Sequence, residues 1–129
     1  MATEDQQELL ATSVGNGAVA APASGATITL WSSDGNANIP TQAARYKKLI
    51  INLYVSHLSA ASGLQVDESN DGGTTWRNLA SYSIAATTYT KTYQTVSAPH
   101  VRVRYVNSAN TLSTWELSVL GDQSDRAVG

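Results

Sequence analysis

Short segments of alternating apolar and polar residues are the feature of this sequence that most constrains its fold. The clearest segment runs from Tyr46 to His57 and places Leu49, Ile51 and Leu53 on one side. Further segments with strand character occur at residues 27–31, 64–69, 76–79, 81–84, 87–96, 100–106 and 112–120. Because side chains along a β-strand point alternately to its two sides, such segments predict half-buried strands. About seven or eight strands separated by Gly, Asn, Ser and Pro predict an all-β fold, an antiparallel β-sandwich or jelly roll.

The length of 129 residues allows one domain with a single hydrophobic core. We expect that core to contain Leu49, Ile51, Leu53, Leu64, Val66, Val101, Val103, Trp115, Leu117 and Val119. The body of the domain is predicted to span residues 26–121, between an N-terminal arm at 1–25 and a C-terminal tail at 122–129. A further turn is predicted at residues 34–36.

The expected arm is rich in Gly, Ala and Ser and lacks a sustained period. Its residues 4–10 could form one or two helical turns, but the arm has too few apolar residues to fold alone. Two interpretations stay open at this point: a flexible terminus, or an extended arm that becomes ordered against another subunit. In the second, the partner-binding anchors are Leu9, Leu10, Val14 and Val19.

Residues 69–76 read Ser-Asn-Asp-Gly-Gly-Thr-Thr-Trp and predict a β-hairpin turn. Asp71 can accept hydrogen bonds from backbone amides of its own turn, and Gly72 and Gly73 permit positive φ angles. The segment resembles the Asp-box pattern through Ser69, Asp71, Gly73, Thr75 and Trp76. In proteins that carry the Asp-box, the pattern forms a hairpin turn and is not the catalytic site, so we expect these residues to have a structural role.

Composition restricts the possible partners. Charged residues make up 14% of the chain and the formal net charge is −2, so no basic bias predicts nucleic acid binding. The absence of Cys excludes disulfides and thiolate chemistry. The apolar runs are too short for a transmembrane helix, so no membrane association is expected. The acidic start of the sequence lacks the apolar core of a secretory signal, which predicts synthesis in a host cytoplasm.

Few residues suggest chemistry. His57 and His100 are far apart in sequence, and neither lies near a nucleophile or at metal-ligand spacing from acidic residues. Asp67, Glu68 and Asp71 form an acidic cluster, but neighbouring strand residues such as Asp67 and Glu68 point to opposite sides and make a poor calcium site. We therefore expect no enzymatic activity, no catalytic residues, no metal and no cofactor.

Two groups of side chains could instead contact partners. Arg102 and Arg104 share one side of a predicted strand, and they either form a solvated face or pair with a partner's carboxylates. Four aromatic residues, which are Trp31, Tyr82, Tyr89 and Tyr93, could form a sugar-binding platform, although cross-strand packing is the commoner role of such residues.

The residues from Leu64 to Trp76, followed by Thr- and Tyr-rich strands and then the stretch from His100 to Asn107, are similar to β-sandwich domains of tailed-bacteriophage head and tail components. The resemblance covers about residues 49–120. The N-terminal arm and the lack of Cys resemble capsid decoration, or cement, proteins.

This resemblance implies a non-enzymatic protein that binds and stabilises the capsid surface of the virion. The implied partners are the major capsid protein, other virion proteins and further copies of the chain itself in a homo-oligomer. Two other interpretations are a tail, neck or fibre component of the virion, and a carbohydrate-binding β-sandwich module.

Overall fold

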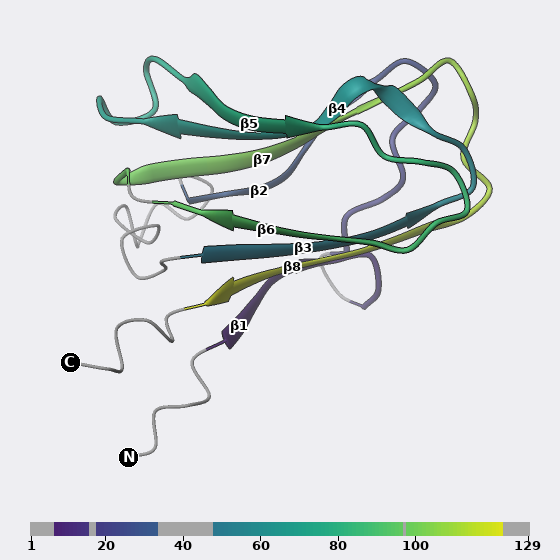
Figure 1. Cartoon of the computed structure of the whole chain (residues 1–129), viewed down its shortest axis with the longest axis horizontal. Helices are drawn as coiled ribbons and strands as arrows, with labels where there is room; N and C mark the ends of the chain where they lie inside the picture. The colour runs from purple at the N-terminus through teal and green to yellow at the C-terminus, as the bar shows by residue number, and fades with distance from the viewer. Residues whose placement is uncertain (1–6, 16–17, 34–47, 97, 123–129) are drawn as a thin grey trace.

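The computed structural model describes residues 7–15, 18–33, 48–96 and 98–122 and shows an antiparallel β-sandwich (Figure 1). The eight strands are β1 (Gln7–Thr12), β2 (Thr27–Ser32), β3 (Lys48–Val55), β4 (Ser59–Ser69), β5 (Arg77–Tyr82), β6 (Thr90–Thr95), β7 (His100–Asn107) and β8 (Trp115–Asp122). The all-β class and the strand number expected from the alternation are confirmed. The turn predicted at 34–36, the start of the predicted strand at Tyr46 and residues 123–129 lie outside the described residues.

Two four-stranded sheets make up the sandwich. We call the sheet with order β1-β8-β3-β6 sheet A and the sheet with order β2-β7-β4-β5 sheet B. The pairs β1–β8, β2–β7, β3–β6 and β4–β5 are all antiparallel and nest inside one another along the chain. This nesting is the strand pairing of a double-sheet jelly roll. Because of this nesting, each sheet pairs strands that are far apart in the sequence.

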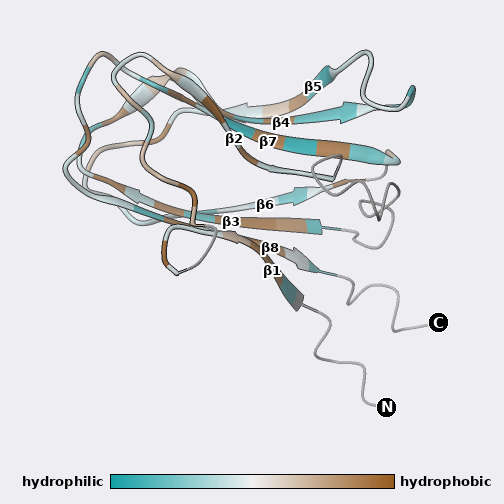
Figure 2. Ribbon diagram, turned by 180° about the vertical axis from the view of Figure 1, so that it is seen from behind, coloured by the Kyte–Doolittle hydropathy of each residue, from teal (hydrophilic) through white to brown (hydrophobic). Residues whose placement is uncertain are grey.

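The core lies between the two sheets and contains the inward-facing residues of both. Figure 2 shows a largely hydrophobic β3 and a β7 on which hydrophobic and hydrophilic residues alternate. The expected core residues are buried, except that Trp115 is partly buried at the border of the core. The Trp115 ring meets Tyr105 edge-on, with 5.1 Å between ring centroids and 74° between planes. Burial raises the pKa of Tyr105 to about 12, so its hydroxyl stays protonated.

The N-terminal residues differ from the expected arm in where they lie. Instead of helical turns, residues 7–12 form β1, which is extended and pairs with β8 of the same chain. The strand contains a bulge between Leu9 and Ala11, and Leu10 and Ala11 pack against the core. One side of the β1 backbone pairs with β8, so contacts within the chain hold this segment against the body.

A strap, residues 18–26, then leads from sheet A to sheet B across the end of the sandwich. The Trp115 indole donates a hydrogen bond to the carbonyl of Val19 (3.0 Å). The Asn107 side chain donates to the carbonyls of Pro22 (3.4 Å) and Ala23 (3.2 Å). The strap is therefore fixed to the ends of β7 and β8, and residues 7–12 and 18–26 belong to the body rather than to a free arm.

Candidate functional site

The hairpin between β4 and β5 is held by the side chains of Ser69 and Asp71. Asp71 Oδ1 accepts hydrogen bonds from the Ser69 hydroxyl and the Thr75 amide, both at 2.8 Å. The Ser69 hydroxyl oxygen accepts from the Gly73 amide at 3.0 Å. Gly72 and Gly73 have φ angles of 77° and 89°, as the turn requires. The carboxylate of Asp71 is thus used inside its own turn.

These hydrogen bonds change the acidity of Asp71. The Thr75 amide, together with the Ser69 hydroxyl, lowers the pKa of the Asp71 carboxyl to about 2. The group is therefore ionised at neutral pH and acts as a hydrogen-bond acceptor for the turn. A carboxyl with this pKa is a poor general acid, which agrees with a structural role.

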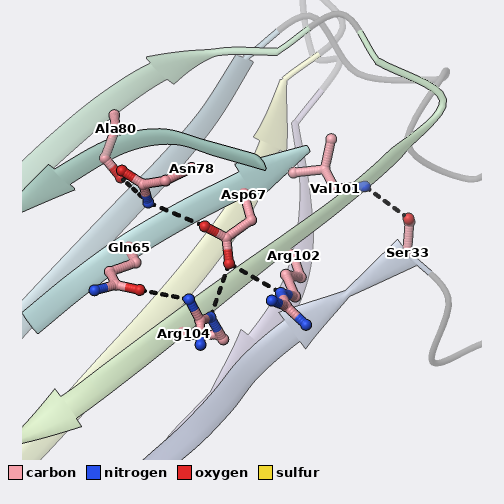
Figure 3. A network of polar contacts seen from close by, with 8 residues as sticks. All are labelled: Ser33, Gln65, Asp67, Asn78, Ala80, Val101, Arg102 and Arg104. Atoms are coloured by element: carbon pink, nitrogen blue, oxygen red, sulfur yellow. Dashed lines mark hydrogen bonds and ion pairs between the residues drawn. The ribbon is translucent and has the colours of Figure 1, made fainter. Parts of the chain in front are cut away.

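A polar network covers the outer face of sheet B (Figure 3). Asp67 of β4 is 1% exposed, and it accepts hydrogen bonds from Arg102 Nε (2.9 Å), Arg104 Nε (2.8 Å) and Asn78 Nδ2 (3.0 Å). Arg104 also donates to Gln65 Oε1. Strand register explains the network, because Asp67 lies opposite Arg102 on β7 and opposite Asn78 on β5.

Electrostatics decide the charge of Asp67. Burial on its own raises the pKa of the Asp67 carboxyl, but the hydrogen bond from Asn78 and the guanidinium groups of Arg102 and Arg104 outweigh burial. The net pKa lies below its usual value, so Asp67 is an anion between two cations. The Arg102 guanidinium also lies over the Trp76 ring, 4.4 Å from its centroid.

The network answers the question that the sequence left open for Arg102 and Arg104. Both side chains are about three-quarters buried and ion-paired with Asp67 of the same chain. Sequence reasoning identified both the arginines and the acidic cluster but did not connect them, because the pairing depends on the β4–β7 register. The alternating pattern did place Asp67, Arg102 and Arg104 on strands. It could not show which residues of neighbouring strands lie opposite one another.

The four expected anchors of the N-terminal segment divide into two groups. Leu10 and Val19 pack against the core and hold the segment to the body. Leu9 and Val14 remain exposed, at 56% and 71% of their surfaces. Only the exposed pair is available to contact another molecule without rearrangement of the body.

Leu9 belongs to a row of apolar side chains that crosses the outer face of sheet A. Leu9 of β1 lies opposite Leu120 of β8. Leu120 lies opposite Ile50 of β3, and Ile50 lies opposite Tyr93 of β6. Residues directly opposite in a sheet share one face, and Ile51 beside Ile50 points into the core, so this row points outward. Its two ends, Leu9 and Tyr93, are both 56% exposed, whereas Ile50 between them is covered and 5% exposed.

A shallow pocket of about 380 Å³ lies next to the apolar row, on the same face of sheet A. Its lining consists of Thr12, Ser13, Val14, Asn52, Tyr89, Glu116, Leu117 and Ser118. The Asn52 side chain donates to the Ser118 hydroxyl at 2.9 Å. Sequence analysis named Tyr89 and Val14 but missed Asn52, Glu116 and Ser118, because their approach again depends on strand register.

The remaining candidate residues are dispersed. His57 is exposed and lies next to Ser56, whereas His100 begins β7. Tyr82 donates a hydrogen bond to Gln94, and Trp31 packs against the core from sheet B, so these two do not share a platform with Tyr89 and Tyr93. Within the described ranges, no three His, Asp or Glu side chains are placed to hold a metal ion, and no helix has the length and apolarity to cross a membrane.

Fold and side-chain geometry thus define a two-sheet jelly-roll domain in which the charged clusters of sheet B serve the fold, while sheet A presents an apolar row and a pocket. Residues 26–120 match the family described as "Uncharacterised protein YqxG N-terminal domain", and the chain belongs to this family. The match begins at the end of the strap and includes β2 to most of β8.

One solved structure shares the fold over nearly the whole chain. It is the crystal structure of PBSX exported protein XepA, with a TM-score of 0.62 and 21% sequence identity. The alignment covers 92% of this chain but 37% of XepA, so this chain spans little more than a third of that protein. No curated protein matches the sequence.

Proposed function

We propose that this chain is a non-enzymatic structural protein of a phage particle that binds and stabilises the capsid surface as a decoration protein. The shared fold with PBSX exported protein XepA supports a phage-related role. The resemblance of the hairpin region and of β7 to phage head and tail domains supports a place in the virion. The principal partner is then the major capsid protein.

The observation that carries the proposal is the apolar row Leu9-Leu120-Ile50-Tyr93 on sheet A. It crosses all four strands, and its two ends are exposed. Leu120 is partly exposed and Ile50 is buried, so the row exposes apolar surface at Leu9, Leu120 and Tyr93. Exposed apolar surface gathered on one face typically marks a protein–protein contact. The low fraction of charged residues favours close packing over long-range electrostatic attraction.

The positions of the acidic side chains agree with a role without catalysis. Asp67 and Asp71, from the acidic cluster, are used by the sheet B network and the hairpin turn. Decoration relies on many weak contacts acting together, so we also propose that several copies of the chain bind one shell, as a homo-oligomer or side by side.

The proposal is tested by sedimentation of the protein with empty capsid shells of the phage that encodes it. Changing both ends of the row, Leu9→Thr and Tyr93→Thr, removes apolar area from the contact while it keeps residues that favour strands. We expect the double variant to lose shell binding without a change in its circular dichroism spectrum.

Leu58→Thr is the matched control, because Leu58 is 54% exposed but lies between β3 and β4, away from the row. It should bind shells like the original protein. Full occupancy by the double variant would contradict the proposal. Electron microscopy of virions in which the protein is labelled distinguishes a position on the capsid from one on the tail, neck or fibre. Label on the tail, neck or fibre alone would also overturn the proposal.

A further inference from the structure

The pocket on sheet A has a composition that the proposed capsid contact does not explain. Its floor is polar and contains Asn52 and Ser118 from the two central strands. Thr12 and Ser13 add hydroxyl groups, and Glu116 adds a carboxylate. At about 380 Å³, the pocket has the size of small-molecule sites in proteins, which are roughly 300–1,000 Å³.

Asn52 provides evidence that the pocket is built for a polar ligand. Its side chain is 6% exposed, and within the described residues its Oδ1 has no hydrogen-bond partner. A buried amide oxygen without a partner destabilises a fold, so such a group calls for an explanation, and a bound polar ligand is one. The Nδ2 group of the same amide is fixed by Ser118, which holds the side chain against the pocket.

Tyr89 provides the second, independent observation. It is 62% exposed, the most of any aromatic residue in the described ranges, and it is part of the pocket lining, as is Val14. Tyr89 is not in a strand, since β6 begins at Thr90, so cross-strand packing does not explain its position. An exposed aromatic ring beside convergent polar groups is typical of sites that bind a ligand with one apolar side.

The surrounding backbone limits the type of ligand. Asn52 lies between β6 and β8, and Ser118 lies between β1 and β3, so both sides of these strands are already paired. A peptide that binds by adding a strand needs an open edge. The pocket also touches the edge strand β1, but the Thr12 carbonyl there already accepts a hydrogen bond from the Val19 amide (2.8 Å). Recognition must use side chains, and those in the described lining offer hydroxyls, an amide and a carboxylate. Lys91 of β6 lies opposite Asn52 on the same face but outside this lining.

We propose that this pocket binds a neutral saccharide. A pyranose ring has an apolar C–H side, which would pack on Tyr89 and Val14, and hydroxyl groups at its rim. Those hydroxyls would donate to Asn52 Oδ1 and to the Glu116 carboxylate and accept from Thr12 and Ser13. Glu116 disfavours acidic sugars through like-charge repulsion. The site uses one of the four aromatic residues suggested by the sequence, with polar partners that the sequence did not reveal.

The test is a titration of the full ¹⁵N-labelled chain with maltotriose, cellotriose and N,N′,N″-triacetylchitotriose at millimolar concentration, followed by ¹H–¹⁵N NMR. We expect at least one of the three to shift the side-chain amide signal of Asn52 and the backbone amides of Thr12 and Ser118 saturably. Tyr89→Ala should weaken that binding by about tenfold or more, because it removes an aromatic contact from an exposed site.

Tyr93→Ala is the matched control for the saccharide site, since Tyr93 is similarly exposed but lies in the apolar row outside the pocket. It should leave the saccharide titration unchanged. No saturable shift with any of the three trisaccharides would overturn the inference, and so would equal loss in both tyrosine variants. Shell binding is a separate readout: it depends on Leu9 and Tyr93 but not on Tyr89, so each proposal can fail alone.

Discussion

At the scale of single residues, two carboxylates that the sequence marked as a possible ion site serve the fold in different ways. Asp67 is buried beneath two arginines on the face of a sheet, whereas Asp71 is exposed and closes a turn. Both have a lowered pKa, so each contributes to stability in its ionised form.

Acid should therefore weaken the fold in a defined pH range. The folded pKa of Asp71, about 2, lies below the ordinary value of 3.8, so the unfolded chain binds more protons between these values. The stabilisation is complete above pH 3.8 and is lost as the pH falls towards about 2. In thermal melts, Asp71→Asn should lower Tm at pH 7, and the difference from the original protein should shrink in acid. A difference that stays constant from pH 7 to pH 2 would contradict this.

Neutralising Asp67 should have a larger effect at neutral pH. Asp67→Asn keeps the shape of the side chain but leaves Arg102 and Arg104 without their anion in a largely covered site. Because both guanidinium groups retain some solvent access, we expect a loss of about 1–3 kcal/mol in the free energy of unfolding by urea. Glu116→Gln, an exposed change on sheet A, provides the control and should change that free energy little.

At the scale of elements, β4 contains a bulge that depends on one glycine. The register of β4 against β7 shifts between Ser59 and Leu64. A Cβ atom on Gly63 would lie 2.6 Å from the carbonyl oxygen of Val106 and 2.9 Å from that of Ala60. Both contacts are backbone atoms, which cannot turn away, so Gly63→Ala should cost about 1–3 kcal/mol in chemical denaturation. An unchanged denaturation midpoint would show that the bulge adjusts freely.

The strap offers a second test at this scale. Trp115→Phe keeps an aromatic ring against Tyr105 but removes the hydrogen bond to the Val19 carbonyl. We expect a loss of about 1 kcal/mol in overall stability. Hydrogen exchange should increase mainly in residues 18–26, because the substitution detaches the strap while the sheets remain paired. Uniform exchange across the chain would mean that the bond does not hold the strap locally.

The sequence predicted well those elements that depend on a local pattern of residues. It predicted poorly those that depend on pairing with a distant strand. Leu49, Ile51 and Leu53 were assigned to the core because a period of two is a local property. β1 was missed because six residues with little alternation become a strand only through pairing with β8 at the other end of the chain. The Asp67 network and the pocket were missed for the same reason, since each joins residues from different strands.

At the scale of the whole molecule, the nested pairing makes most contacts non-local. β4 pairs with β5 across a short hairpin, but β1 pairs with β8 across almost the entire chain. Folding that must close such long loops is slow, so we expect refolding in the range of about milliseconds to seconds in stopped-flow fluorescence. Refolding within microseconds would contradict the nested topology as the origin of the rate.

Ile51→Ala, in the centre of the core, should lower the free energy of unfolding by about 2–5 kcal/mol in the same experiment.

The pairing of β1 with β8 also sets how this domain would sit within a longer polypeptide. Gln7 and Asp122 lie opposite each other on neighbouring strands, so the main chain enters and leaves the sandwich at one place. Any segment joined before β1 and any segment joined after β8 would begin side by side. The rest of such a polypeptide would therefore attach at one place on the domain, and the domain would project to one side of it. Pulling on the two ends would then separate β1 from β8 one residue pair at a time, starting from the pair formed by Gln7 and Asp122.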